Sequence, residues 1–194
     1  MSLRERKAAK KKEDILRSAS SVISRQGFHK TTMEDIAAEL LMTKGSLYYY
    51  FKNKEELLFH CHDLILTGAM ELMEDIYQED ISSKDKMEKA IKVHLDIAIQ
   101  EKEIFNLIVK PEQIFSEENI EDIVKKRDAY AGLFDKIIAQ GVERGEFNLR
   151  QQKMARMIIL GATNWIQVWY SEKGEFSKEE IEEIYAEFLI KMLL

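Results

Sequence analysis

The segment from Thr31 to Leu58 constrains the fold of this chain more than any other. Its sequence, TTMEDIAAELLMTKGSLYYYFKNKEELL, predicts two short helices joined by a tight turn, followed by the start of a third helix. The first short helix has an apolar face at helical spacing, formed by Met33, Ile36, Ala37 and Leu40.

Residues that favour helix N-termini precede each of these helices. Thr31 or Thr32 is predicted to cap the first helix, with Glu34 at the capping-box position relative to Thr31. The corresponding caps are Thr43 for the second helix and Asn53, with Glu56 closing the capping box, for the third.

The second short helix, Thr43 to Phe51, has the chemistry of a surface that meets a polyanion. It opens with Lys44, Gly45 and Ser46, which are small or basic, and continues with three tyrosines. Small residues permit a close approach, while lysines and phenolic hydroxyls donate to phosphate oxygens. The segment is therefore predicted to be a helix-turn-helix whose recognition helix is this one.

The same residues resemble the TetR family of one-component transcriptional regulators. The resemblance covers about fifty residues: a helix before Gly27-Phe28, then Thr31-Thr32, Asp35-Ile36-Ala37, Lys44 to Phe51 and Lys54-Glu55-Glu56-Leu57. The family usually has a small residue, a glycine and an apolar residue in the turn, where this chain has Leu40-Leu41-Met42. Glycine takes a positive φ without steric cost, so either Leu41 is strained or the turn is built differently.

The resemblance implies a set of DNA-contacting residues around the recognition helix. Lys44 is expected at a base or a phosphate, Tyr48 at a base, and Tyr49, Tyr50 and Lys54 at phosphates. The full predicted DNA-binding set is Thr32, Met33, Thr43, Lys44, Gly45, Ser46, Tyr48, Tyr49, Tyr50 and Lys54. Leu47 and Phe51 are predicted to be the core residues of this helix.

Composition predicts an almost entirely helical, all-α protein. One proline and eight glycines in 194 residues leave little turn material, and long Glu/Lys/Leu/Ile/Met-rich segments fill the chain. We predict a three-helix DNA-binding domain at 1–56 and a larger helical domain for effector binding and dimerisation at 57–194. A single cysteine, Cys61, and the lack of long apolar stretches favour a reducing cytoplasm and no membrane partner.

The net charge of −6 is divided unevenly between the predicted domains. Residues 1–56 hold 12 Lys/Arg against 8 Asp/Glu, a balance of +4, whereas 57–194 hold 17 against 27, a balance of −10. Six of the basic residues lie between Arg4 and Lys12, around the start of the first predicted helix at 8–26. A solvated tail is one interpretation of this run, and beside the motif an arm that contacts DNA is the better one.

The segment from Leu149 to Ser171 is apolar nearly all round and is predicted to be one helix. A helix without a polar face must be covered on both sides. We therefore predict a homodimer, in which this helix and the last helix, capped by Ser177, form a four-helix bundle with a second copy.

Arg127 stands in the predicted apolar stripe Ile123, Tyr130, Phe134. It either reaches the surface or pairs with an acid such as Glu103, or it anchors a ligand carboxylate, phosphate or thioester. The predicted ligand-binding residues are Phe105, Val109, Arg127, Tyr130, Phe134, Asn164, Trp165 and Trp169. For the aromatic residues, core packing is the simpler alternative.

No nucleophile–base pattern or phosphate loop is evident, so we predict no enzyme, no catalytic residue and no cofactor. His60 to Asp63 are successive helical residues that point in different directions, so no metal site is predicted. The resemblance implies a repressor that binds a palindromic operator in double-stranded DNA as a dimer and is released by a small lipophilic or acyl-CoA-type effector. Two alternatives remain: a multidrug-type regulator that senses cationic or aromatic compounds, and a DNA-binding dimer without an effector.

Overall fold

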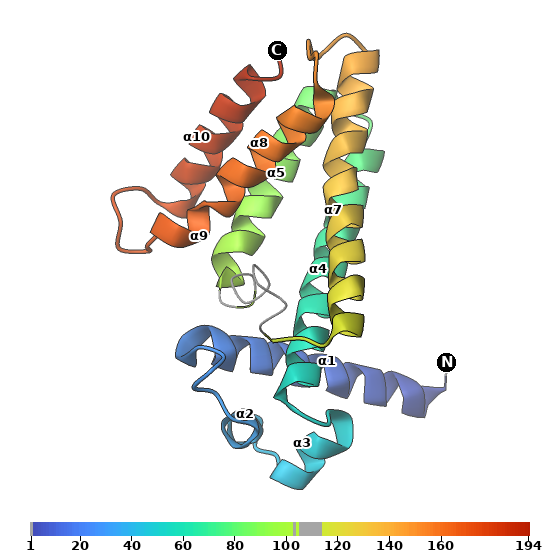
Figure 1. Ribbon diagram of the computed structural model, residues 1–194, viewed down its shortest axis with the longest axis vertical. Helices are drawn as coiled ribbons and strands as arrows, with labels where there is room; N and C mark the ends of the chain where they lie inside the picture. Colours follow the sequence, from blue (N-terminus) through green and yellow to red (C-terminus); the bar gives the residue numbers. More distant parts are fainter. Residues whose placement is uncertain (1, 103, 105–113) are drawn as a thin grey trace. The chain divides into compact units, whose positions relative to one another are not determined.

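A computed structural model describes residues 2–102, 104 and 114–194, and every regular element in these ranges is an α-helix (Figure 1). The helices are α1 (Leu3–Gln26), α2 (Met33–Glu39), α3 (Lys44–Tyr50), α4 (Lys54–Gln78), α5 (Ser83–Gln100), α7 (Glu117–Glu143), α8 (Gln152–Asn164), α9 (Ile166–Trp169) and α10 (Lys178–Lys191). The predicted all-α class is confirmed. Among the described helices, none combines the length and apolar character needed to cross a membrane.

The first helix is longer than predicted. Ser2 caps α1, because its hydroxyl accepts from the Glu5 N–H at 3.3 Å and the Glu5 carboxylate accepts from the Ser2 N–H at 2.7 Å. The basic run from Arg4 to Lys12 is therefore helical with mostly exposed side chains, so it is solvated but is not a disordered tail. The capping box supplies the start that spacing alone did not reveal.

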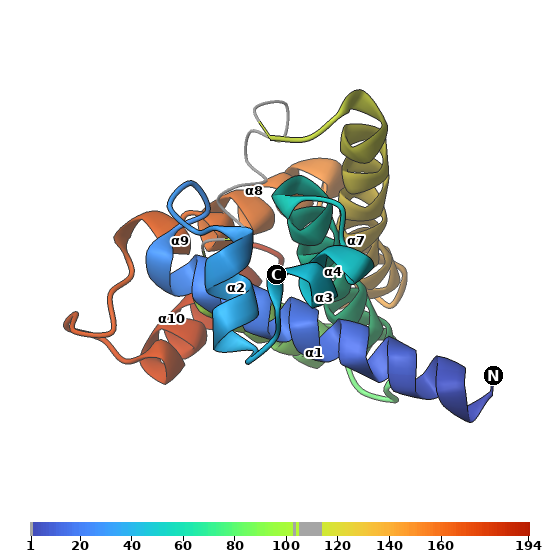
Figure 2. The same cartoon turned by 90° about the horizontal axis from the view of Figure 1, so that it is seen from below.

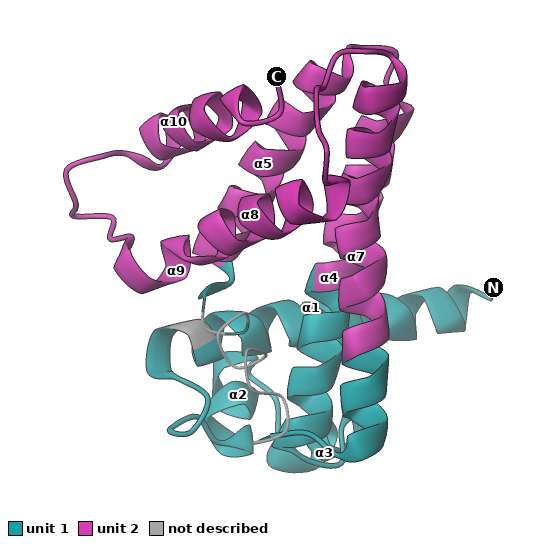
Figure 3. Ribbon diagram, turned by 45° about the horizontal axis from the view of Figure 1, so that its top comes forward, with its two compact units in different colours: residues 1–65, 101–123 teal, residues 66–100, 124–194 magenta. Residues whose placement is uncertain are grey.

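The described chain forms two compact units (Figure 3). Unit 1 comprises residues 1–65 and 101–123, and unit 2 comprises residues 66–100 and 124–194. The core of unit 1 joins α1, α2, α3 and the start of α4, and its largest fully buried side chains include Ile15, Ile23, Ile36, Leu47, Phe51, Leu57 and Leu58.

Unit 2 is organised around α5, which packs against α8, α9 and α10. Met87, Ile91, Leu95 and Ala98 form the inner face of α5 and are all buried. The N-terminus of α5 is capped by Glu146, a residue far away in the sequence. The Glu146 carboxylate accepts from the Ser83 N–H at 2.6 Å and from the Lys84 N–H at 3.2 Å. A carboxylate at this position satisfies orphan amide groups and complements the helix dipole.

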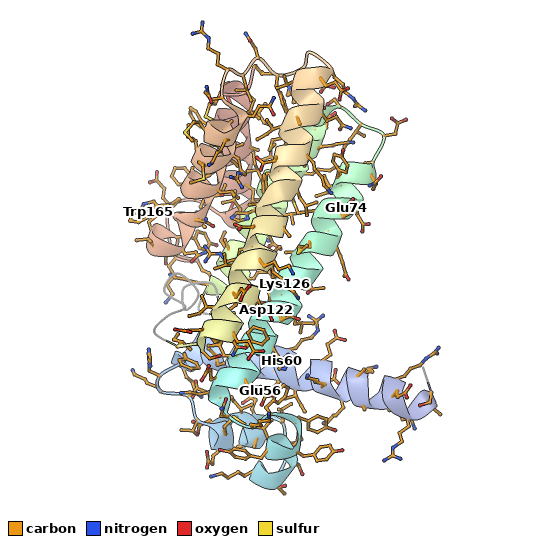
Figure 4. The ribbon with its side chains drawn as sticks, turned by 45° about the vertical axis from the view of Figure 1, so that its right-hand side comes forward. Glu56, His60, Glu74, Asp122, Lys126 and Trp165 are labelled. Carbon is orange, nitrogen blue, oxygen red and sulfur yellow. The ribbon has the colours of Figure 1, made fainter. Side chains whose placement is uncertain are left out.

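The single helix predicted from Leu149 to Ser171 is instead two helices, with the break at Trp165. One face of α8 is buried through Ala155, Ile159 and Thr163. The other face leaves large apolar side chains in solvent, and further ones follow on α9 and α10: Met154, Met157, Ile158, Trp165, Val168, Trp169, Ile184 and Phe188. Figure 4 shows Trp165 projecting outward, with 60% of its surface exposed.

A polar cluster lies inside unit 2, centred on His94 of α5. Nδ1 of His94 lies 3.0 Å from the Tyr130 hydroxyl, and Nε2 lies 3.0 Å from Oδ1 of Asn164. The aromatic rings of Tyr130 and Phe134 flank the imidazole at 5.7 and 5.9 Å. Burial lowers the pKa of His94 to about 4, and the bond to Asn164 only partly offsets this. The ring is therefore neutral at pH 7 and links α5, α7 and α8 through hydrogen bonds.

This buried histidine makes stability depend on pH. In the unfolded chain His94 titrates near its ordinary value of 6.5, so below that pH the unfolded state binds the extra proton. Stability contributed by the neutral ring is present above pH 6.5 and is lost as the pH falls toward 4.

In chemical denaturation at pH 7 and pH 5, the wild type should lose about 2 kcal/mol more unfolding free energy than His94→Gln. The matched control is His29→Gln at an exposed position, which should keep the wild-type pH dependence. Equal pH dependence in wild type and His94→Gln would contradict a buried neutral ring.

Candidate nucleic-acid interface

The first helix of the motif, α2, begins at Thr32. The Thr32 hydroxyl accepts from the Asp35 N–H at 3.1 Å, and the Asp35 carboxylate accepts from the Thr32 N–H at 2.8 Å. The capping box predicted from Thr31 and Glu34 is therefore wrong. Thr31 is buried and its hydroxyl donates to the Gly27 carbonyl at 2.9 Å. This arrangement leaves the Glu34 carboxylate exposed for another partner.

The turn between α2 and α3 has the positive-φ backbone geometry that a glycine usually adopts. Leu41 has a φ of 53°, which confirms the first of the two predicted alternatives, strain at Leu41. Its N–H donates to the Ala38 carbonyl at 3.0 Å, and the Met42 N–H donates to the Ala37 carbonyl at 2.8 Å. These two bonds are the usual helix-terminating pair around a left-handed residue. The Leu41 side chain is 96% exposed, so only the backbone of this residue shapes the motif.

The recognition helix α3 starts at Thr43 as predicted, with the Thr43 hydroxyl accepting from the Ser46 N–H at 3.2 Å. Leu47 and Phe51 are buried, which confirms them as the core residues of this segment. Their burial turns the remaining side chains outward, and Tyr49 is 84% exposed. An open depression on this side is lined by Met42, Thr43, Gly45, Ser46, Tyr49 and Tyr50.

Lys44, the first residue of α3, forms an ion pair with Glu34 of α2. Its ammonium also lies 5.7 Å from the centre of the Tyr48 ring. The hydrogen bond between the two side chains lowers the pKa of Glu34 and raises that of Lys44, so both are charged at neutral pH. The strongest candidate for a base contact is thus already engaged by a carboxylate in the absence of DNA.

Two residues of the predicted DNA-binding set make contacts within the protein. The Met33 side chain is buried, because its place on the apolar face of α2 directs it into the core. The Lys54 ammonium donates to the carbonyls of Phe28 at 2.8 Å and Thr31 at 2.9 Å, and lies 4.2 Å from the centre of the Phe28 ring. Desolvation lowers the pKa of Lys54. Lys54 therefore ties the start of α4 to the turn before α2, and its predicted phosphate contact would have to use the one remaining N–H.

The start of α4 also differs slightly from the prediction. Asn53 caps it, since Oδ1 accepts from the Glu56 N–H at 2.7 Å. The Glu56 carboxylate, however, accepts from the Lys52 N–H at 2.6 Å and not from Asn53.

The structure brings three predicted ligand-binding residues together and separates others from them. Tyr130, Phe134 and Asn164 meet at His94, which the sequence interpretation missed. Arg127 is exposed, whereas Ile123, Tyr130 and Phe134 are buried, so its expected place inside this apolar stripe is wrong. Trp165 and Trp169 are also exposed. Phe105, Val109 and Glu103 lie outside the described residues.

A short recognition helix, held by its apolar residues and presenting small, phenolic and basic groups, defines a helix-turn-helix DNA-binding protein. Comparison with known proteins makes this more specific. Residues 15–61 match the model for bacterial regulatory proteins of the tetR family, and residues 80–193 match the model for a tetracyclin repressor-like C-terminal domain. The chain belongs to the TetR family of transcriptional regulators.

Individual relatives agree with this assignment. The fatty acid metabolism regulator protein of Bacillus subtilis is 26% identical over 161 residues, covering 78% of this chain and 81% of the relative. A TetR/AcrR-family regulator from Thermobifida fusca shares the fold with a TM-score of 0.80 and 25% identity, over 93% of this chain and 97% of that one. AibR, solved in complex with isovaleryl coenzyme A and operator DNA, has a TM-score of 0.75 at 22% identity, over 94% and 97% of the two chains.

The contacts of Lys54 generate a test that separates structure from DNA binding. Lys54→Met should reduce the unfolding free energy by about 1–3 kcal/mol, because two carbonyl groups lose a charged donor. The control is Lys52→Met, an exposed lysine two residues earlier, which should change stability by less than about 0.5 kcal/mol. Thermal and chemical denaturation of both variants provide the measurement. If Lys54→Met leaves stability unchanged but weakens DNA binding, the predicted phosphate contact is its main role.

Proposed function

We propose that this protein is a homodimeric repressor that binds a palindromic operator and is released by an acyl-CoA or a related lipophilic effector. The observation that carries the DNA-binding part is the geometry of α3. Leu47 and Phe51 anchor the helix in the core of unit 1, so Lys44, Gly45, Tyr48 and Tyr49 are presented to solvent at its outer side. These are the groups that a major-groove helix requires for close approach and for donation to phosphates and base edges.

The attraction to DNA would come largely from α1. Figures 1 and 2 show α1 extending past α2 and α3 toward the N-terminus. Arg4, Lys7 and Lys11 follow one another at helical spacing in this extension and are exposed. A basic helix beside the motif favours phosphate contacts and gives binding a strong dependence on salt.

The exposed apolar face of α8, α9 and α10 supports the dimer. Met157, Ile158 and Phe188 are large apolar side chains exposed to water, and their transfer out of water is favourable. A second copy that packs the same face against this one would cover both patches. Dimerisation would also supply the two recognition helices that a palindromic operator needs.

The polar cluster around His94 supports an effector of low charge inside unit 2. At neutral pH the imidazole and the Tyr130 hydroxyl are buried, neutral hydrogen-bonding groups, and the exposed Asn164 contributes its neutral amide from the edge of the cluster. Such groups suit the carbonyl of an ester or thioester better than a free carboxylate. Arg127 is exposed one helical turn before Tyr130 on α7, where a guanidinium suits a phosphate at the surface. A fatty acid metabolism regulator among the relatives supports the same class of effector.

Release would act through α4. This helix begins in unit 1, directly after the recognition helix, and continues into unit 2, which holds the His94 cluster. A ligand that favours one position of α4 would change how the two recognition helices of a dimer fit the operator. The shift can be no larger than the difference between the ligand's affinities for the two states.

The effector part can be tested on a duplex selected from a randomised pool. Long-chain acyl-CoA should weaken binding about ten-fold, which corresponds to a coupling of about 1.4 kcal/mol. Arg127→Ala should reduce this response and leave DNA binding intact, whereas Arg150→Ala, at another exposed arginine, should respond like the wild type. The measurement is fluorescence anisotropy of the labelled duplex with increasing acyl-CoA.

Two results would contradict the effector assignment. If DNA binding is tight but insensitive to acyl-CoA, the protein is either a sensor of another compound class or a dimer without an effector. If Arg127→Ala and wild type respond equally, Arg127 takes no part in effector binding.

A further inference from the structure

The motif itself carries few cations for a surface that is proposed to bind DNA. In α2 the charged residues are the acids Glu34, Asp35 and Glu39, and in α3 the single charged residue is Lys44. Asp35 is engaged in the cap of α2, and Glu39 pairs with Arg25 of α1 at 2.8 Å. Glu34 is left to face Lys44, so the charge of the recognition helix is compensated within the protein.

The Glu34–Lys44 pair is exposed, with 53% and 57% of the two side chains accessible. Exposed ion pairs add little to folding stability. The pair therefore matters more for the anions that approach than for the fold. It lies beside the Thr43 cap and the Tyr48 ring, at the start of the helix proposed to enter the groove.

Non-specific and specific DNA place different demands on this pair. On non-specific DNA a lysine contacts phosphates, so Lys44 would exchange one anion for another and leave Glu34 close to the negative backbone. A base edge offers neutral acceptors, such as the O6 and N7 atoms of guanine. An ammonium has three N–H donors, so Lys44 can donate to a base edge while it still contacts the carboxylate. The ion pair thus disfavours phosphate contacts on non-specific DNA more than it disfavours contacts to base edges.

We propose that Glu34 is a specificity-determining residue, which holds Lys44 as an ion pair and thereby suppresses non-specific binding to DNA. The inference rests on the proposed DNA-binding function and goes beyond it by assigning a role to an acid in a surface that contacts phosphates. Glu34 acts through Lys44, and its removal should increase affinity for DNA in general while reducing discrimination. This sign is opposite to that expected for a residue that contacts the operator directly.

The test compares Glu34→Gln with wild type on two duplexes of equal length, one selected from a randomised pool and one with the same bases shuffled. On the shuffled duplex, Glu34→Gln should bind about three- to ten-fold more tightly, and its dependence on salt should be steeper by about one phosphate contact. On the selected duplex the gain should be smaller, so the ratio of the two affinities falls. Adding Lys44→Ala to Glu34→Gln should remove the gain on the shuffled duplex.

Glu39→Gln is the matched control, because it removes the same charge from the same helix by breaking the pair with Arg25. It should leave the ratio of the two affinities close to that of the wild type. The inference is overturned if Glu34→Gln changes neither affinity, if it changes both by the same factor, if Glu39→Gln lowers the ratio equally, or if operator affinity drops. A wild-type protein that binds neither duplex would instead reject the proposed DNA-binding function itself.

Discussion

The DNA-binding surface depends on the burial of Leu47 and Phe51 at the two ends of one helical turn. With seven residues, α3 is far too short to be stable as an isolated helix in water. It is held by these two side chains in the core of unit 1 and by the hydroxyl cap from Thr43. Because their directions are fixed, the directions of Lys44, Tyr48 and Tyr49 are fixed as well. Loss of this anchoring would remove the surface without changing any residue that is predicted to contact DNA.

Charge is arranged around this surface in a way that separates attraction from recognition. The basic residues of unit 1 are concentrated on α1, whereas the recognition helix has one lysine, paired with Glu34. Long-range attraction falls with salt and does not depend on sequence, while contacts at base edges do. Placing most cations outside the recognition helix allows attraction without committing that helix to phosphates.

The motif could be predicted from sequence because its signals are local. Capping residues, apolar spacing and turn length lie within about thirty residues and agree with one another. The positive φ of Leu41 was one of the two alternatives that the missing glycine raised. The exact cap of α2 could not be predicted, because Thr31 and Thr32 are each followed three residues later by an acid. Non-local facts were also missed. Lys54 donates to carbonyls 23 and 26 residues away, and His94 meets partners 36 and 70 residues away. The place of His94 among the apolar positions of α5 was the one signal available, and Arg127 shows that such a place does not guarantee burial.

We expect two copies of the chain to bind one operator, joined through the exposed apolar face of α8, α9 and α10. The most direct measurement is the mass of the complex with a selected duplex, by native mass spectrometry or sedimentation. It should show two protomers of 22.7 kDa, or a multiple of two, per duplex. Ile158→Glu should abolish this complex by placing a charge in the interface, whereas Val124→Glu, at an exposed apolar residue of α7, should preserve it. A single wild-type protomer bound to the duplex with full affinity, or an Ile158→Glu variant that still binds as a pair, would contradict the account.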